Sequence, residues 1–216
     1  MTINDIANLI IPEQFGCGNS MEIIDEDAIF EQLDDSVDTA WGVSKFVILF
    51  DDAVVKIPFN GSFFYDEDDD YENGGEYIFD EFHNKNYCKT EAAVYADAVT
   101  AGVEFFFAST KFAGMTRDNT PYYISERVYD SYDDNNDEIK TPSKDSREKA
   151  EQAIDTFKSE LDEVWLALAY EWYGDAAVQQ LLNFIKEEHI SDLHSGNIGF
   201  RKNGAPVILD YSSFDE

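Results

Sequence analysis

The stretch that decides the fold class lies near the C-terminal end and reads Ile190-Ser-Asp-Leu-His-Ser-Gly-Asn-Ile-Gly-Phe-Arg-Lys-Asn-Gly-Ala-Pro-Val-Ile-Leu-Asp-Tyr211. Asp192 is followed five residues later by Asn197, and Asp210 stands at the end of an apolar run. Between them, two short apolar segments flank a polar, glycine-containing turn, which is typical of a β-hairpin. The sequence therefore predicts three oxygen acceptors held by one loop and one short hairpin.

Three acceptors in this order are what phosphoryl transfer requires. One carboxylate takes the proton of the attacking hydroxyl, while an amide oxygen and a second carboxylate hold the magnesium ions that bridge the phosphates. Asp192 fits the base, and Asn197 and Asp210 fit the metal ligands. The alternative is a solvent loop with a capping Asp, since Asp, Asn and Gly are common in loops. The spacing to Asn197 and the hairpin before Asp210 favour phosphotransfer.

Asp192-Leu193, followed by Asn197, also matches by spacing the H-R-D-L-x-x-x-N signature of protein kinases. The stretch resembles aminoglycoside phosphotransferases, and more closely the small serine/threonine kinases carried by bacteriophages, whose loop is similar to His194-Ser-Gly-Asn-Ile198. The resemblance extends from about Gly42 to Tyr211. It implies an α+β protein with a reduced bilobal protein-kinase-like fold, in which an antiparallel-sheet N-lobe and a helical C-lobe hold ATP and Mg²⁺.

The resemblance also implies a division into two lobes. Residues 1–128 are expected to form the N-lobe, with nucleotide-binding strands and a regulatory-type helix. Residues 129–216 are expected to form a truncated C-lobe with the catalytic and metal-binding loops. The stop at Glu216 predicts that the activation segment and the lower helices of ordinary kinases are absent. Activity would then need no activating phosphorylation, and generic peptides would be poor substrates.

Three positions depart from the kinase pattern. Ile190 stands where kinases carry His, Ser191 stands where many carry Arg, and the Asp-Phe-Gly triplet becomes Asp210-Tyr-Ser. The first change affects the packing of the catalytic loop, and the second removes the usual reader of a phosphorylated activation loop. His194, inside the loop, is expected to be a structural or phosphate-proximal donor rather than a base.

Lys56 is the most informative residue of the first half. It lies in the apolar run 53–59, where alternation places it on one face with Val54 and Pro58. A lone buried ammonium costs several kcal/mol, so Lys56 must reach water or a carboxylate. By itself such a lysine is usually an edge or solvent residue. The resemblance implies instead that Lys56 holds the α and β phosphates of ATP and pairs with a Glu of the following helix, which is Glu91.

The remaining nucleotide contacts are expected at a turn and at a strand end. Gly42-Val-Ser-Lys45 stands where kinases carry G-x-G-x-x-G. Backbone N–H groups at Gly42, the hydroxyl of Ser44 and the ammonium of Lys45 would cover the phosphates, although a plain turn fits equally well. The segment 122–128 falls at the kinase hinge, so backbone groups near Glu126 and Val128 would pair with adenine. An ordinary core strand is compatible with that role.

Periodicity and turn residues predict the other elements. Helices are expected over 27–33, 86–102, 146–173 and 175–188, with Gly102 as a C-cap. Strands are expected over 42–50, 53–59, 105–112 and 122–128, the first two joined as a hairpin by an Asp51-Asp52 turn. The acidic segment 60–85 is expected to be a solvated insertion, and the polar, acidic segment 130–146 is expected to be the crossing between the lobes. Strands followed by helices, with no internal repeat, favour the α+β class.

The charge of the chain restricts its partners. Its 216 residues include 15 basic and 46 acidic side chains, which gives a net charge of −31, against a magnitude of about 2–8 for a small soluble domain. Direct nucleic-acid binding is excluded as an interpretation, because that affinity depends on Lys and Arg neutralising phosphates. Basic protein surfaces are the expected macromolecular partners. Two cysteines, no basic leader and no apolar run of about 20 residues predict a cytoplasmic protein without a membrane span.

Three functions follow from these observations. The first is an ATP-dependent phosphotransferase acting on Ser or Thr of proteins, plausible as a phage kinase that modifies host proteins. The second is a catalytically weak, pseudokinase-like binding module, favoured by the missing His, the thin glycine loop and the early chain end. The third is an acidic nucleic-acid mimic that inhibits a DNA-binding protein, which the charge of −31 suggests.

Overall fold

The computed structural model describes residues 1–18, 23, 25–34, 37–42, 44–64, 76–78, 86–129, 141–157, 161–191 and 193–211. The chain forms two compact units. The first unit contains Met1–Lys89 and Thr110–Glu126, and the second contains Thr90–Ser109 and Arg127–Glu216. Much of the two acidic segments lies outside the described residues.

The predicted α+β class is confirmed, because the first unit carries a five-stranded antiparallel sheet and the second carries most of the helices. The further assignment of 1–128 to nucleotide binding and of 129–216 to catalysis stays a prediction.

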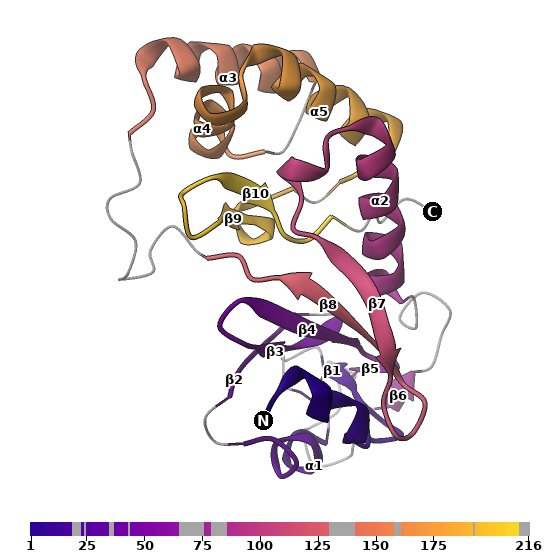
Figure 1. The fold of residues 1–216 in the computed structure, drawn as a ribbon. Coiled ribbons are helices and arrows are strands. Elements are labelled where there is room, and N and C mark those ends of the chain that lie inside the picture. Colours follow the sequence, from indigo (N-terminus) through magenta and orange to yellow (C-terminus); the bar gives the residue numbers. More distant parts are fainter. Residues whose placement is uncertain are drawn as a thin grey trace. The chain divides into compact units, whose positions relative to one another are not determined.

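The sheet of the first unit has the strand order β2-β3-β4-β8-β7 (Figure 1). Its strands are β2 (Asp38–Trp41), β3 (Lys45–Leu49), β4 (Ala53–Pro58), β8 (Pro121–Glu126) and β7 (Thr110–Met115). The predicted hairpin of the first two apolar runs is confirmed: β3 pairs with β4, and the Phe50 N–H donates to the Ala53 carbonyl at 2.9 Å across the Asp51-Asp52 turn.

One face of this sheet is apolar and covered by the N-terminal segment. Side chains from β3 and β4 pack there with η1 (Ile3–Asn8) and α1 (Glu26–Phe30). The cluster includes Phe46, Ile48, Val55 and Ile57. Because side chains alternate along a strand, the residues between them must face the other side. That opposite face therefore receives Lys45, Val47, Val54 and Lys56.

Asp118 fastens the N-terminal segment to the turn between β7 and β8. Its carboxylate accepts hydrogen bonds from the Thr116 and Thr120 hydroxyls, both at 2.6 Å, and from the Ile11 N–H at 3.1 Å. Burial by itself would raise the pKa of Asp118, but these hydrogen bonds hold it below its usual value. The apolar cover of the sheet is thus anchored by a charged group.

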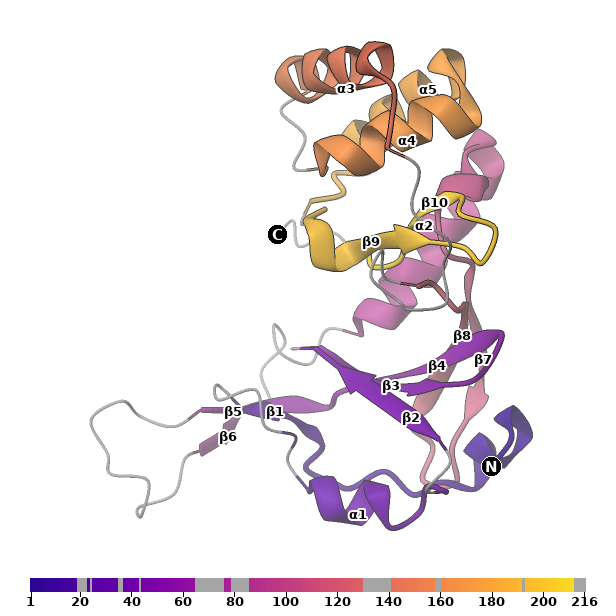
Figure 2. The same cartoon turned by 90° about the vertical axis from the view of Figure 1, so that its left-hand side faces the viewer.

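A second, smaller sheet of the first unit contains β1 (Gly16–Gly18), β5 (Gly61–Phe64) and β6 (Glu76–Ile78) (Figure 2). β1 pairs with β5 in parallel, and β5 pairs with β6 in antiparallel fashion. The predicted helix over 27–33 is the shorter α1. Cys17 and Cys88 are both buried and free of disulfides.

The helices α3 (Lys144–Phe157), α4 (Glu163–Tyr173) and α5 (Asp175–Glu187) of the second unit lie together beside the hairpin of β9 (Ile198–Phe200) and β10 (Pro206–Ile208) (Figures 1 and 2). The helix α2 (Tyr87–Ala101) confirms the prediction over 86–102 and is followed by Gly102, whose φ is +72°. This left-handed conformation is the one that favours Gly at a helix C-terminus. None of the helices in the described part of the chain combines the length and the apolar character needed to span a bilayer.

The predicted strand over 105–112 is wrong in its first half. Residues Glu104–Phe106 form the 3-10 helix η2, and β7 begins only at Thr110. The physical reason is that the backbone groups of 105–108 form hydrogen bonds with the β9–β10 hairpin and with Arg201 in its turn. Arg201 donates to the carbonyls of Phe105 and Phe107, at 2.7 and 3.1 Å, and the Ala108 N–H donates to the Ile208 carbonyl at 2.7 Å.

The single long helix predicted over 146–173 is also wrong, because α3 ends at Phe157 and α4 begins at Glu163. Asp162 has an extended backbone, with φ −60° and ψ 132°, and its carboxylate accepts the Trp165 N–H at 2.9 Å. This is an N-cap, which satisfies one of the N–H groups left open at a helix start. The apolar period continues across the break, so periodicity could not reveal it.

Replacing this cap tests the break between α3 and α4. Asp162→Ala is expected to lower the free energy of unfolding by about 1 kcal/mol, because an orphan N–H loses its acceptor, while Asp162→Asn retains most of it. Urea unfolding followed by circular dichroism measures the change. Asp155→Ala, an exposed site within α3, removes the same charge and is the matched control. Equal effects at both sites would contradict the capping role.

Candidate functional site

The second unit brings Asn197 and Asp210 together, although twelve residues lie between them in the sequence. The Asn197 carbonyl accepts the Leu209 N–H at 2.9 Å and the Asp210 N–H at 3.4 Å. Asn197 ends the 3-10 helix η3 (Ser195–Asn197), and Asp210 follows β10 by two residues. The predicted hairpin between them is confirmed by the pairing of β9 with β10. An amide and a carboxylate therefore stand on adjacent backbone.

Ala108 fixes the chain on both sides of Asp210. Its N–H donates to the Ile208 carbonyl at 2.7 Å, and its carbonyl accepts the Tyr211 hydroxyl at 2.6 Å. The Tyr211 side chain is fully buried, and its ring lies edge-on to Phe107 with centroids 5.0 Å apart. Sequence reasoning treated this tyrosine only as a departure from Asp-Phe-Gly. The hydroxyl that distinguishes it from Phe is what ties the Asp210 backbone to the core.

The hairpin is held at its other edge by Tyr129 and Trp165. Tyr129 and Phe200 exchange two backbone hydrogen bonds of 2.9 Å, and the Trp165 indole N–H donates to the Gly199 carbonyl at 3.2 Å. A Cβ at Gly199 would lie 2.5 Å from Val128 Cγ1 and 2.7 Å from the Tyr129 carbonyl oxygen. The close approach of two backbones therefore requires Gly at this position. Sequence reasoning missed Trp165, Gly199 and Tyr129 as supports of the site.

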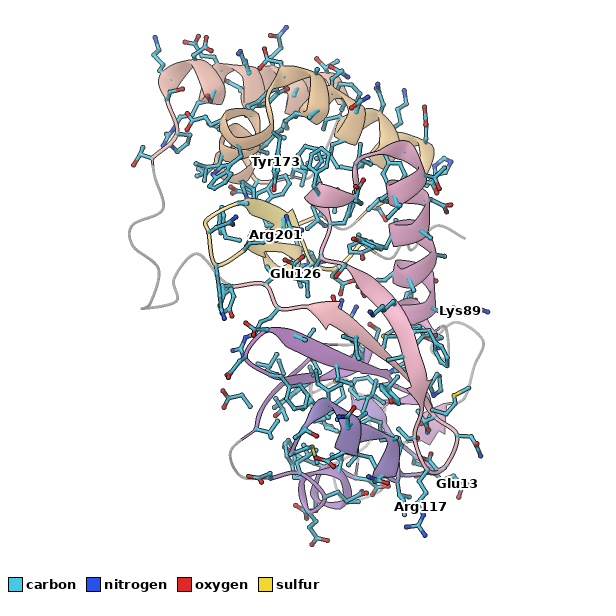
Figure 3. All side chains as sticks on the ribbon, viewed as in Figure 1. Glu13, Lys89, Arg117, Glu126, Tyr173 and Arg201 are labelled. Atoms are coloured by element: carbon cyan, nitrogen blue, oxygen red, sulfur yellow. The ribbon has the colours of Figure 1, made fainter. Side chains whose placement is uncertain are left out.

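Arg201 and Tyr173 complete this support (Figure 3). The Tyr173 hydroxyl donates to the Pro206 carbonyl at 2.8 Å and lies 3.4 Å from the Arg201 guanidinium. The guanidinium also donates hydrogen bonds to the carbonyls of Phe105 and Phe107. Both side chains hold backbone carbonyls, so neither has the geometry of a reactive group.

His194 shapes the loop before Asn197. Its Nδ1 accepts the Gly196 N–H at 2.9 Å, and its carbonyl accepts the Asn197 N–H at 2.9 Å. A Cβ at Gly196 would lie 2.8 Å from the His194 ring. The other ring nitrogen, Nε2, lies 3.4 Å from the Asn197 side-chain nitrogen. These contacts fit the structural role expected for this histidine.

Asp192, the expected base, lies outside the described residues. Of its neighbours, Ser191 is exposed and Leu193 is buried. Ile190, at the position of the kinase His, is buried in the apolar core of the second unit, and its N–H donates to the Ile185 carbonyl at 2.9 Å. The start of the loop is therefore anchored by an apolar side chain instead of by an imidazole.

In the first unit, Lys56 lies at the centre of the sheet. It stands opposite Val47 of β3 and Tyr123 of β8, and it is only 4% exposed. The phenol of Tyr123 accepts a hydrogen bond of 3.2 Å from the Asn86 amide, which precedes α2. Burial raises the pKa of this phenol, although the bond from Asn86 opposes the shift. The residues around Lys56 are thus a buried, partly polar face.

The turn before β3 is tight. The Gly42 N–H donates to the Lys45 carbonyl at 3.2 Å, and the Ser44 carbonyl accepts the Phe59 N–H at 3.0 Å. The first bond occupies one N–H group that a phosphate-covering loop would present. Ser44 and Lys45 are the polar side chains of this turn, and Lys45 is only 6% exposed.

The other expected site residues are distributed over both units. Gly42, Ser44, Lys45, Lys56 and Glu126 belong to the first unit, with Glu126 half-buried at the end of β8 (Figure 3). Glu91, Val128, Asn197 and Asp210 belong to the second unit. Glu91 lies on α2 and is fully buried, whereas Val128 packs where a Gly199 side chain would be.

The oxygen donors of Asn197 and Asp210 are the ligand types that Mg²⁺ prefers, and Mg²⁺ is usually held by one or two carboxylates together with substrate phosphates. The chemistry of the pair therefore fits a magnesium ion whose other ligands are the phosphates of a nucleotide. Within the described ranges, no three His, Cys, Asp or Glu side chains gather as a site for a metal ion. A site built from an amide and a carboxylate lies outside that residue set.

Neither a protein-family model nor a curated protein sequence matches the chain. Among solved structures, the GDP and kanamycin complex of the aminoglycoside phosphotransferase APH(2″)-IIia is similar to it at 12% identity. The match covers 85% of this chain and 69% of that chain, with a TM-score of 0.34. A TM-score this low carries no conclusion, so the proposals below rest on the residues of this chain.

The hairpin geometry yields a prediction at Gly199. Gly199→Ala is expected to lower the free energy of unfolding by about 1–3 kcal/mol, because the new Cβ meets a backbone carbonyl that cannot move without displacing the hairpin. Thermal and urea unfolding measure the change. Gly42→Ala is the matched control, since a Cβ there meets nothing within 4 Å. If both variants unfold alike, the close approach at Gly199 is not a constraint.

Proposed function

We propose that this chain is an ATP-dependent phosphotransferase that acts on Ser or Thr hydroxyls of proteins. The observation that carries the proposal is the adjacency of Asn197 and Asp210, two oxygen ligands held by one closed hairpin. Phosphoryl transfer depends on positioning and on charge neutralisation more than on covalent chemistry. Two oxygen ligands on adjacent backbone would supply the positioning of Mg²⁺ on which this chemistry depends.

Each site residue has a role in this proposal. Asp192 accepts the proton of the attacking hydroxyl, and Asn197 and Asp210 hold Mg²⁺, which when bound neutralises charge on the β and γ phosphates. Lys56 binds the α and β phosphates, and Glu91 orients Lys56. Both side chains are buried, 4% and 0% exposed, and buried charges of opposite sign are usually paired. Backbone groups near Glu126 and Val128 pair with adenine.

The protein substrate is proposed to be basic. The net charge of −31 attracts cationic surfaces and speeds their encounter with the chain. Two free, buried cysteines suit a reducing compartment such as the cytoplasm. A phage kinase that modifies host proteins is one setting with these properties, and it remains part of the proposal.

A catalytically weak binding module is the second candidate. Ile190 in place of the kinase His and the tight turn at Gly42 both favour it. It predicts nucleotide binding without transfer. The acidic nucleic-acid mimic rests on charge alone, and it predicts neither nucleotide binding nor phosphate transfer.

Mass spectrometry of a cell lysate incubated with the protein and Mg-ATP separates these functions. Phosphorylated Ser or Thr in lysate proteins or in the chain itself, absent with Asp192→Ala, supports the phosphotransferase. Nucleotide binding with no incorporation would establish the binding module and overturn catalysis.

The metal and nucleotide site gives a prediction on stability. Mg-ATP is expected to raise the melting temperature, and Asp210→Ala is expected to abolish the rise, because a ligand that binds only the native state at a hundred times its dissociation constant adds about 2.7 kcal/mol. Differential scanning fluorimetry measures both. Asp97→Ala, an exposed acidic site on α2, should retain the full shift. An unchanged wild-type melting curve at millimolar Mg-ATP would refute the nucleotide site.

The proposed pairing of Lys56 with Glu91 yields a second prediction. Lys56→Met and Glu91→Gln should each weaken nucleotide binding and stability, while the double variant should be scarcely worse than either, because removing one partner strands a buried charge. Titration calorimetry and urea unfolding measure the four-protein cycle. Lys89→Met removes an exposed lysine of the same helix and is the control. Fully additive losses would show that Glu91 is not the partner.

A further inference from the structure

We propose that a cavity among the helices α3, α4 and α5 binds the guanidinium group of an arginine side chain that a protein partner presents. The inference deepens the proposed function, because it states how a basic protein is recognised, and it rests on that proposal. None of the side chains that line the cavity comes from the loop before Asn197 or from the β9–β10 hairpin. The cavity is therefore built from other residues than the proposed metal ligands.

The cavity has a volume of about 340 Å³ and lies within the second unit. Ligand pockets have volumes of about 300–1,000 Å³, so this one is large enough for the end of a long side chain. One face of α3 lines it from Lys149 to Phe157, together with Tyr170 from α4 and with Asp175 and Gln179 from α5. The helices α3 and α5 both lie next to α4 (Figures 1 and 2).

Two half-buried aromatic side chains, Tyr170 and Phe157, line the cavity. No side chain or backbone group of the described residues forms a hydrogen bond with the Tyr170 hydroxyl. Burial raises the pKa of this phenol, the Asp175 carboxylate raises it further, and the Lys149 ammonium opposes the shift. The tyrosine therefore lies close to both charges. A guanidinium stacks on aromatic faces and is attracted to them electrostatically, so these rings suit an arginine.

The charged groups at the cavity carry an excess of one negative charge. The Lys149 ammonium lies 3.1 Å from both oxygens of Asp175 and 3.2 Å from Asp145 Oδ2, so two carboxylates surround one ammonium. Asp175 and Asp145 are 67% and 79% exposed, and ion pairs between exposed side chains contribute little to stability. A guanidinium that enters the cavity can therefore bind Asp175 in place of Lys149 at small cost.

The last turn of α3 adds negative potential at the other end of the cavity. Thr156 and Phe157 of this turn line the cavity, and the turn contains no basic side chain. A helix C-terminus carries partial negative charge, which a cation stabilises. The helix α5 begins at the same cavity, and Asp175 in its first turn offsets the partial positive charge of that helix end. Both ends of the cavity therefore favour a cation.

The rim of the cavity offers oxygen atoms to a donor. Gln152, Thr156 and Gln179 are exposed, whereas the lining residue Ala153 is only 7% exposed, so the cavity opens outward from a buried floor. The Gln179 amide nitrogen lies 3.4 Å from Asn183 Oδ1, so its amide oxygen is the group left for a donor. Arginine has five N–H donors in a planar group, whereas lysine has three on a point charge. Oxygen acceptors beside aromatic rings therefore favour arginine over lysine.

The charge of the whole chain indicates the source of the arginine. A net charge of −31 attracts basic protein surfaces and repels acidic ones. Arginine is also one of the side chains that contribute most to the affinity of protein interfaces. One arginine of a basic protein would enter the cavity from its exposed rim while the rest of that protein contacts the acidic surface.

The test titrates the ¹⁵N-labelled whole chain with N-acetyl-arginine amide at fixed ionic strength and follows the side-chain amide signals of Gln152 and Gln179 by NMR. Saturable shifts are expected, with an affinity about threefold or more above that of N-acetyl-lysine amide, because only the guanidinium combines stacking with several donors. N-acetyl-citrulline amide has a similar shape without the charge and should give no saturable shift.

Four variants separate the cavity from the general acidity of the chain. Lys149→Met removes a competing cation and should tighten binding of the arginine derivative about threefold, whereas Asp175→Asn should weaken it by about the same factor. Tyr170→Leu should weaken it about fivefold, and Tyr170→Phe, which keeps the ring, should retain it. The matched control is Asp155→Asn, the same charge change at an exposed site of α3 outside the cavity, which should bind as wild type.

Three results would overturn the inference. These are equal affinity for the arginine and lysine derivatives, wild-type affinity in Tyr170→Leu, and tighter binding of free L-arginine than of its capped derivative, which would indicate a free amino acid as the ligand. If the arginine derivative binds as expected but no phosphate is ever transferred to protein, the cavity stands and the phosphotransferase falls. If protein is phosphorylated but Gln152 and Gln179 do not respond to the derivative, the cavity alone falls.

Discussion

The candidate metal ligands depend on two backbone groups of one residue, the N–H and the carbonyl of Ala108. The N–H binds the end of β10, and the carbonyl binds the buried hydroxyl of Tyr211, so the chain is fastened immediately before and after Leu209 and Asp210. A buried hydrogen bond contributes only about 1 kcal/mol net, but leaving its partner unsatisfied costs more. Two such bonds around two residues therefore fix the direction of the backbone that carries Asp210, and the Asn197 carbonyl then closes the hairpin.

Hydrogen bonds to backbone groups also explain why the segment 105–108 is not a strand. In a strand its N–H and carbonyl groups would be used by neighbours in a sheet. In this protein Arg201, Ile208 and Tyr211 use them instead. Phe106 and Phe107 are also both fully buried, which the alternation of a strand would not allow in a sheet with one apolar face. The support of the site and the loss of a predicted strand thus have one cause.

The sheet of the first unit contains two buried lysines, Lys45 and Lys56. The N-terminal segment covers one face with apolar side chains and is fastened by the Asp118 carboxylate. The remaining face keeps Lys45, Lys56 and the phenol of Tyr123 among buried residues. Because these side chains are buried, a substitution there is expected to change the free energy of unfolding.

Sequence alone determined the α+β class and four local elements, because local periodicity or turn residues predict each of them. These elements are the hairpin of β3 and β4, the helices α2 and α5, and the hairpin between Asn197 and Asp210. It also indicated the residues of the candidate site by their order and spacing. Only the tertiary structure decided that one predicted helix is two, since Asp162 acts as a cap through a bond to Trp165 that the apolar period does not reveal. It alone decided that Tyr211 anchors Asp210 to Ala108 and that Gly199 must be Gly, since those contacts join residues distant in the sequence. Local sequence patterns indicate which face of a helix or strand is apolar. The hydrogen-bond partner of a buried polar group depends on which distant residues the tertiary structure brings close to it.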